Sequence, residues 1–304
     1  GDISIAKKLI EVAADCGADY VKFQTFKADE LVSRNAKKAE YQIKYTSKSE
    51  THYQMIKRLE LTEKMHETLI NHCEKSDIKF MSSPFGVSSV KLLNKFQIDT
   101  YKIPSGEITN FPMWKCFGGL EKNIILSTGM APLSEIKDAV DVLYEQGLKK
   151  ERLIILHCNT EYPTPYIDVN LKAMKTIQNK FGTSVGYSDH TEGIEVSVAA
   201  VAIGAEVIEK HFTLDKKLPG PDHNAILEPA DLKKLIVSLR IIDIAMGDGI
   251  KTPSKSEKKN ISVARKSLVA SKTIKKGEEF DEKNIIPKRP GVGISPMMWE
   301  SLLG

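Results

Sequence analysis

The sequence predicts an α/β protein: a (β/α)₈ barrel, or TIM barrel, followed by a small β-rich C-terminal module. Three observations support this prediction. Short β-type runs alternate with helical patterns along most of the 304 residues, as they do in parallel α/β folds. Polar residues gather where these runs end, which is where barrel enzymes carry their active sites. The alternation stops near Gly247, after which the pattern changes.

The first predicted element is a helix over residues 3–16, where apolar positions recur at helical spacing and Gly17 ends the pattern. Seven β-type runs follow, each short enough to be a buried parallel strand. They lie at residues 20–24, 79–82, 100–103, 123–127, 153–157, 184–187 and 206–209. The further helical patterns lie at residues 63–75, 88–95, 133–144, 171–180, 194–203 and 229–245.

A closed barrel of this kind needs eight strands, and the sequence shows seven. Because the chain begins with a helix, we expect the first barrel strand to precede Gly1. The alternative fold is a doubly wound open sheet. No GxGxxG motif opens a helix in this sequence, which weakens the nucleotide-binding form of that alternative.

The domain organisation follows from the change near Gly247. We expect a catalytic barrel domain at residues 1–250, a linker at residues 251–262 and a small module at residues 263–304. The linker is polar and basic, which is typical of a solvated connector. The module combines two β-type stretches with a turn at residues 275–278, and we expect it to be truncated at Gly304.

Composition excludes several classes of function. The net charge of +4 is small beside 44 basic and 40 acidic side chains, so no nucleic-acid-binding face is indicated. No apolar run approaches the length of a membrane span. The four cysteines show no CxxC spacing, so we expect free thiols rather than a zinc site or a disulfide framework. Free thiols favour a cytoplasmic location.

Two lysines inside β-type runs suggest an anion-binding site. Lys22 (in VKFQ) and Lys102 (in YKIPSG) would face a barrel interior, where a lysine is costly to bury unless it meets an anion. The alternative is that one lysine extends to solvent. Hydroxyl side chains at other strand ends would complete a pocket for phosphate and carboxylate, namely Ser83, Ser105, Ser127 and Ser188.

His190 and His211 follow adjacent predicted strands and could together hold one divalent metal ion. A single histidine in such a place is more often a hydrogen-bonded core residue, so the metal-site interpretation depends on the pair. His223 offers a further ligand from a loop. The remaining histidines with helical or loop contexts are interpreted as surface residues: His52, His66 and His72.

Nine ordered runs of the sequence resemble the bacterial N-acetylneuraminate synthase family, whose close relatives make legionaminic and pseudaminic acids. They are VKFQTFKADELVS, KAEYQIK, SSPF, YKIPSGEITN, ILSTGMA, LHCNTEYPTPY, GYSDHT, IEKHFTLDKKLPGPDH and KRPGVGISPMMW. Any one run is a weak signal, but their number and order are specific. The resemblance covers nearly the whole chain and includes a C-terminal antifreeze-like (SAF) module.

The resemblance implies an enzyme that joins C3 of phosphoenolpyruvate to the aldehyde carbon of an open-chain N-acetyl sugar and releases phosphate. It implies use of Mn²⁺, with Mg²⁺ or Co²⁺ as alternatives. It also implies a homodimer in which each C-terminal module caps the partner's barrel. A family segment with a glutamate for acid–base chemistry would precede Gly1.

Site residues are carried over by motif. The resemblance implies that phosphoenolpyruvate is bound by Lys22, Gln24, Ser83, Lys102, Ser105, Ser127, Thr160 and Ser188. It implies that the sugar contacts are Glu107, Tyr162, Asp222 and Arg289, with the arginine supplied by the partner chain, and that the metal ligands are His190 and His211. Catalytic roles are expected for Glu107, Lys102, Tyr162 and Asp222. Thr160 departs from the family pattern, which has Asn at this place.

We therefore expect a synthase that makes an N-acetylneuraminate-type product, with N-acetylmannosamine as the first choice of sugar. Synthesis of N,N'-diacetyllegionaminate or pseudaminate is the alternative within the family. A Schiff-base aldolase or lyase is a rival, because lysines inside barrel strands can be nucleophiles. A non-catalytic fragment that binds sugar acids is another.

Overall fold

The computed structural model describes residues 1–38, 49–119, 121–218 and 226–304. The chain divides into two compact units, Gly1–Gly247 and Asp248–Gly304, and each is described by itself. Among the described residues, no helix is both long and apolar enough to cross a membrane.

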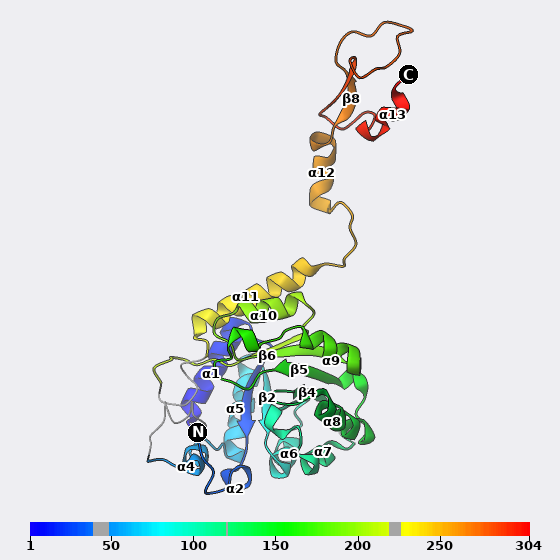
Figure 1. Ribbon diagram of the computed structural model, residues 1–304. Coiled ribbons are helices and arrows are strands. Elements are labelled where there is room, and N and C mark those ends of the chain that lie inside the picture. The colour runs from blue at the N-terminus through cyan, green and yellow to red at the C-terminus, as the bar shows by residue number, and fades with distance from the viewer. Residues whose placement is uncertain (39–48, 120, 219–225) are drawn as a thin grey trace. The chain divides into compact units, whose positions relative to one another are not determined.

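The first unit is built on seven parallel strands that pair in the order of the sequence and curl into a half-barrel with helices outside it (Figure 1). The strands are β1 (Tyr20–Thr25), β2 (Lys79–Pro84), β3 (Thr100–Ile103), β4 (Asn123–Ser127), β5 (Leu153–Cys158), β6 (Ser184–Asp189) and β7 (Val207–Lys210). Every predicted strand is present, and its ends agree with the prediction within two residues. The predicted fold class is confirmed.

The predicted helices of this unit are also present. They are α1 (Ile3–Cys16), α5 (Glu63–Lys75), α6 (Val87–Lys95), α8 (Leu133–Glu145), α9 (Ala173–Phe181), α10 (Glu195–Ala202) and α11 (Pro229–Met246). In the described part of this unit, three short helices lie between them: α2 (Ala28–Leu31), α4 (His52–Lys57) and α7 (Phe111–Trp114). Helix α1 begins where the Asp2 carboxylate accepts hydrogen bonds from two backbone amides and ends at Gly17, whose φ of +87° suits glycine.

The two faces of the strands carry different side chains. In β3, Tyr101 and Ile103 are fully buried in the layer between the sheet and the helices, whereas Lys102 points into the curl. Inside the curl, an apolar layer made of Met81, Ile125 and Leu156 forms a separate small core. One step nearer the carboxyl ends, the same face of each strand becomes polar. This layering positions the site described below.

Gly186 illustrates how tightly this layer is packed. A β-carbon at this position would lie 2.3 Å from the Val207 carbonyl oxygen and 2.6 Å from a methyl carbon of Leu156. Only glycine therefore allows β6 and β7 to approach each other beside the apolar layer.

The prediction that His66 lies on the surface is wrong. Its side chain is fully buried, and Nε2 lies 2.8 Å from the hydroxyl of Thr25. The ring stacks on Phe96 at a centroid distance of 5.9 Å. His66 shares the buried face of α5 with Leu69 and Cys73, at helical spacing. Burial lowers the pKa of this histidine. His52 and His72 are partly buried.

The second unit contains a two-stranded antiparallel sheet, β8 (Ser267–Ala270) and β9 (Ile285–Lys288). Two helices belong to it, α12 (Lys255–Ala264) and α13 (Trp299–Leu302). Helix α12 occupies much of the segment expected to be a linker. It begins at a capping box in which Ser254 and Glu257 each accept a hydrogen bond from the other's backbone amide.

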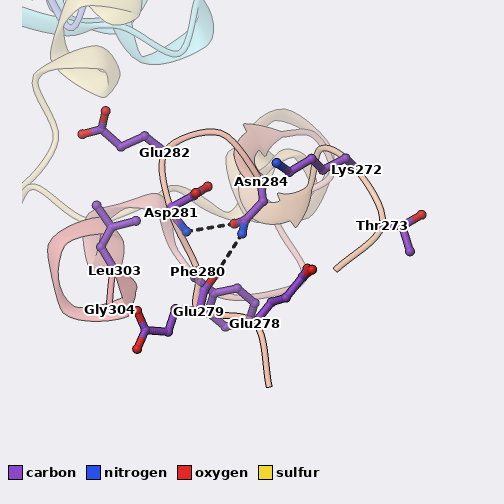
Figure 2. Close-up of a pocket in the computed structure, with 10 residues that line it drawn as sticks. All are labelled: Lys272, Thr273, Glu278, Glu279, Phe280, Asp281, Glu282, Asn284, Leu303 and Gly304. Carbon is purple, nitrogen blue, oxygen red and sulfur yellow. Dashed lines mark hydrogen bonds between the residues drawn. The ribbon is translucent and has the colours of Figure 1, made fainter. Parts of the chain in front are cut away.

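The second unit contains a hollow of about 640 Å³, and Figure 2 draws the residues that line it. Four acidic side chains contribute to its lining: Glu278, Glu279, Asp281 and Glu282. The side chain of Asn284 is held by backbone groups of Glu279 and Asp281. None of the predicted site residues lines this hollow, so the chemistry must be sought in the first unit.

Candidate active site

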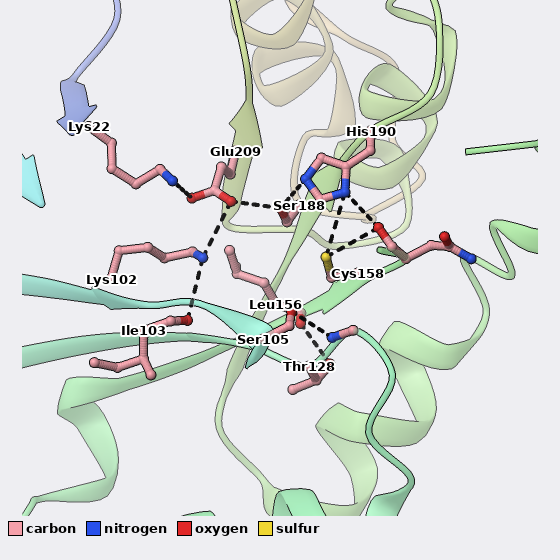
Figure 3. A network of polar contacts seen from close by, with 12 residues as sticks. Lys22, Lys102, Ile103, Ser105, Thr128, Leu156, Cys158, Ser188, His190 and Glu209 are labelled. Atoms are coloured by element: carbon pink, nitrogen blue, oxygen red, sulfur yellow. Dashed lines mark hydrogen bonds and ion pairs between the residues drawn. The ribbon is translucent and has the colours of Figure 1, made fainter. Parts of the chain in front are cut away.

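The carboxyl ends of the strands bring five of the predicted residues together around one side chain, Glu209. Its carboxylate lies 3.3 Å from Nζ of Lys22 and 3.3 Å from Nζ of Lys102, and it accepts a 2.7 Å hydrogen bond from Ser188 (Figure 3). These groups come from β1, β3, β6 and β7. Both predicted lysines therefore point into the curl, as expected.

Charge stabilises this cluster. Burial raises the pKa of the Glu209 carboxyl, but the nearby Lys102 and Lys22 outweigh that effect and hold the pKa well below its usual range. Glu209 is therefore a carboxylate near neutral pH. Burial lowers the pKa of Lys102, and the Glu209 carboxylate acts in the opposite direction. With both lysines protonated, the cluster carries one more positive than negative charge. A buried site with a surplus positive charge favours an anionic ligand.

The two predicted histidines lie beside this cluster. Their ring centroids are 5.3 Å apart, and one ligand atom from each of His190, Glu209 and His211 lies within 4.8 Å of the others. Burial lowers the pKa of both rings, that of His211 to about 3. Both imidazoles are therefore neutral, which is the form that binds metal ions.

The hydrogen bond of His190 fixes which of its nitrogens is available. Nδ1 lies 2.6 Å from the carbonyl oxygen of Asn159, so it carries the proton and donates. Nε2 then keeps its lone pair and faces Ser188, 3.4 Å away. This is the outer-shell arrangement found around metal-binding histidines. The donor set of two imidazoles and one carboxylate fits a divalent ion with open positions.

Two of the predicted serines offer unused hydrogen-bonding groups. The hydroxyls of Ser83 and Ser127 are buried and meet no hydrogen-bond partner among the described residues. Buried hydroxyls are rarely left unsatisfied, so a bound ligand is a natural partner for them. The hydroxyl of Ser105 accepts a 2.9 Å hydrogen bond from the amide of Gly129, which joins the end of β3 to the loop after β4.

Thr160 and Gln24 are exposed residues at the edge of the site. The Thr160 hydroxyl is close to Gly129, because a β-carbon at that glycine would lie 2.1 Å from it and 3.0 Å from the Ser105 hydroxyl. Gln24 is exposed and pairs in register with Ser83, on the same face of β1 as Lys22.

The predicted sugar contacts fall in different places. The Tyr162 ring lies over His190 at a centroid distance of 4.2 Å. Glu107 is buried and accepts a 2.6 Å hydrogen bond from the Asn110 amide. Arg289 is exposed in the second unit. Asp222, like His223, lies outside the described residues.

Sequence reasoning assigned no role to Glu209, which is the centre of the cluster. The signal was present, because Glu209 lies two residues before His211 and so shares its face of the strand. A carboxylate inside a β-type run is as costly to bury as a lysine. Cys158 was also missed as a neighbour of the site. Its sulfur lies 3.9 Å from Nδ1 of His190.

Comparison with known proteins gives consistent matches over both units. The model of the NeuB family matches residues 9–251, and the model of the SAF domain matches residues 265–304. The chain is 57% identical over 304 residues to an N,N'-diacetyllegionaminic acid synthase of Campylobacter jejuni, covering all of this chain and 91% of that protein. It is 43% identical over 306 residues to an N,N'-diacetyllegionaminic acid synthase of Legionella pneumophila, covering all of this chain and 86% of that protein.

Among solved structures, the fold resembles that of an N-acetylneuraminic acid synthetase from Leptospira borgpetersenii. The two structures superpose with a TM-score of 0.76, cover 86% of each chain and share 34% sequence identity. The comparisons therefore agree on one group of enzymes that make nonulosonic acids.

Proposed function

Because this chain belongs to the NeuB family, we propose that it condenses phosphoenolpyruvate with an N-acetylated amino sugar and water to give a nonulosonic acid and inorganic phosphate. One observation of the structure carries the proposal. Two lysines, two neutral histidines and a carboxylate meet at the carboxyl ends of parallel strands, beside two buried hydroxyls that lack a partner among the described residues.

The comparisons change our choice of sugar. N-acetylmannosamine was the first expectation, but the legionaminate synthases at 57% and 43% identity favour the alternative over the neuraminate enzyme at 34%. We therefore propose the diacetamido sugar for legionaminate as the acceptor and N,N'-diacetyllegionaminate as the product.

We propose that Lys22 and Lys102, which pair with the Glu209 carboxylate in the free protein, pair with the anionic groups of phosphoenolpyruvate when this substrate binds. The hydroxyls of Ser83 and Ser127, with Ser105, Ser188, Thr160 and Gln24 around them, would complete the anion pocket. A charge-assisted contact with phosphate is stronger than one between neutral groups. The lysines would hold the enol so that C3 faces the sugar carbonyl, which is an orientation effect.

His190, His211 and Glu209 would hold the divalent ion, with Mn²⁺ preferred and Mg²⁺ or Co²⁺ as alternatives. When bound, the ion would act as a Lewis acid on the sugar carbonyl. Glu107 would hold or move a proton at its free carboxylate oxygen. Tyr162 and Asp222 would contact the sugar.

The choice of sugar is tested by a direct comparison of substrates. We expect kcat/KM for the diacetamido sugar to exceed that for N-acetylmannosamine by at least about 10-fold, because a site that hydrogen-bonds the second acetamido group would leave buried polar groups unpaired when that group is missing. Product is measured by mass spectrometry at fixed phosphoenolpyruvate and Mn²⁺. Equal kcat/KM values, or a preference for N-acetylmannosamine, would contradict the proposed acceptor.

We also propose a homodimer in which the SAF module of one subunit caps the barrel of its partner and presents Arg289 to the sugar. Arg289 is exposed within its own unit, and a guanidinium can bind sugar hydroxyls or an acetamide oxygen. A cap over the barrel mouth would keep the reacting groups from bulk water.

Subunit mixing tests this arrangement. Arg289→Ala and His190→Ala proteins are each expected to be inactive, but exchange between them produces hybrid dimers with one intact site. Since half of the randomly exchanged dimers are hybrids, about one quarter of wild-type activity should return. Exchange is verified by mass spectrometry of differently tagged subunits. A mixture that exchanges fully yet stays inactive would show that Arg289 serves its own barrel.

One observation supports a Schiff-base aldolase as a second candidate. Burial lowers the pKa of Lys102, although Glu209 acts in the opposite direction, and buried lysines are suited to nucleophilic roles. Borohydride with pyruvate would trap Lys102, Lys22 or Lys210 in such an enzyme. We place the reaction in the cytoplasm, consistent with four free cysteines.

A further inference from the structure

The residues that precede the two histidines form a buried ion pair for which the proposed mechanism has no use. Asp189 and Lys210 end β6 and β7 and face each other in register. Nζ of Lys210 lies 3.0 Å from Oδ2 of Asp189, and their side chains are 4% and 0% exposed. The next residues along the chain are His190 and His211.

The pair also holds the backbone at Thr191, the residue that follows His190, by hydrogen bonds. Oδ1 of Asp189 accepts hydrogen bonds from the backbone amide and the hydroxyl of Thr191, at 2.8 and 2.7 Å. Lys210 donates a 2.6 Å hydrogen bond to the carbonyl oxygen of Thr191. The backbone is therefore held immediately before and immediately after His190.

A third contact ties the pair to the helix layer. The hydroxyl of Ser197, in α10, donates a 2.5 Å hydrogen bond to Oδ2 of Asp189. Because side chains alternate along a strand, Asp189 and Lys210 point away from the face that carries Ser188 and Glu209. The pair does not contact the cluster in which substrate would bind, so it cannot take part in the chemistry directly.

Burying two charges is expensive, and an apolar pair of similar volume often stabilises a fold equally well. An apolar pair would make no directional hydrogen bonds. It would therefore hold neither the turn at Thr191 nor the relative position of the two strand ends. A charged pair with every polar atom engaged allows one geometry, and histidines that bind metal depend on such outer contacts.

We propose that Asp189 and Lys210 are positioning residues that set the distance and orientation of His190 and His211 for a divalent ion. This inference rests on the metal site of the proposed function. The ion pair, Thr191 and Ser197 form one network that fixes two adjacent strand ends, and the histidines extend from those ends.

The test is Mn²⁺ binding by the 304-residue chain in the absence of substrates, with the free Mn²⁺ measured by electron paramagnetic resonance. Lys210→Met keeps the length of the side chain and removes its charge and donors. We expect its dissociation constant for Mn²⁺ to rise about 10- to 100-fold, with far-ultraviolet circular dichroism retained. Ser197→Ala, which leaves both charges in place, should give a smaller rise.

The matched control is Tyr101→Phe, which removes a buried hydrogen bond to Asn94 in α6 and should lower thermal stability without changing Mn²⁺ affinity. Folded Lys210→Met protein with wild-type affinity, or an equal loss in Tyr101→Phe, would overturn the inference. If Lys210→Met does not fold, unchanged affinity in Ser197→Ala overturns it instead.

The same titration separates this inference from the proposed function. If the wild-type protein binds no Mn²⁺, or His190→Ala binds it as tightly as wild type, the metal site itself is wrong and the inference falls with it. If His190→Ala loses the ion while Lys210→Met and Ser197→Ala keep wild-type affinity, only the positioning role is overturned.

Discussion

Replacement of His190 or His211 by alanine is expected to lower kcat/KM by at least about 10²- to 10³-fold, because a catalytic metal ion contributes several kcal/mol to the transition state. Both rings are neutral; His190 is buried and His211 is partly buried beside Glu209. Loss of either ring leaves two ligand groups. Activity is measured over a range of Mn²⁺ concentrations after removal of bound metal by a chelator, and dependence on the ion should vanish with activity.

His157 provides the matched control for the histidine variants. It lies in β5 of the same barrel, but its Nε2 donates to the Val169 carbonyl oxygen on the outer side of the sheet. His157→Gln should keep Mn²⁺ dependence. Near-wild-type activity with bound metal in either His190→Ala or His211→Ala would contradict the assignment of the ligands.

Substitution of Lys102 by methionine should weaken phosphoenolpyruvate binding far more than sugar binding. The Lys102 side chain is 3% exposed. Loss of a charge-assisted contact with a buried anion costs about 2–5 kcal/mol, or roughly 30- to 5,000-fold in affinity. Glu209 keeps Lys22 as a partner in this variant, so the cluster does not lose all of its positive charge.

Isothermal titration with phosphoenolpyruvate measures the effect of Lys102→Met, and steady-state kinetics give the KM for the sugar. Lys79→Met serves as the control, since Lys79 lies at the exposed amino end of β2, away from the carboxyl ends. If Lys102→Met bound phosphoenolpyruvate with wild-type affinity, the anion pocket would be elsewhere.

The fold was predictable because its signals are local and repeated. Each strand is a short β-type run next to a helical pattern, and the structure reproduces every one within two residues. The structural prediction was less accurate where one local motif pointed to a helix or to burial but the polar residues around it favoured a linker or an exposed position. Ser254 and Glu257 form a capping box, yet the surrounding lysines favoured a linker over the helix α12. His66 was assigned to the surface, although it shares an apolar helix face with Leu69 and Cys73.

The sequence predicted individual residues of the site but not the contacts between them. Lysines and histidines at the ends of predicted strands are recognisable in the sequence, because burying such side chains is costly unless they bind something. The role of Glu209 depends on the curl of the sheet, which brings β7 within reach of both β1 and β3. No residue spacing in the sequence predicts that a side chain of β7 contacts side chains of both β1 and β3. The Asp189–Lys210 pair likewise depends on the register of β6 and β7.

The central claim is that carbon–carbon bond formation consumes phosphoenolpyruvate at the Lys22–Lys102–Glu209 cluster. Its most direct test is the stoichiometry of a single incubation of the protein with phosphoenolpyruvate, the diacetamido sugar and Mn²⁺. Nonulosonic acid is measured by mass spectrometry and inorganic phosphate by a coupled assay. The account predicts equal amounts of the two products, no product when pyruvate replaces phosphoenolpyruvate, and no trapping by borohydride. Product formed from pyruvate, with a lysine of the barrel trapped by borohydride, would contradict it.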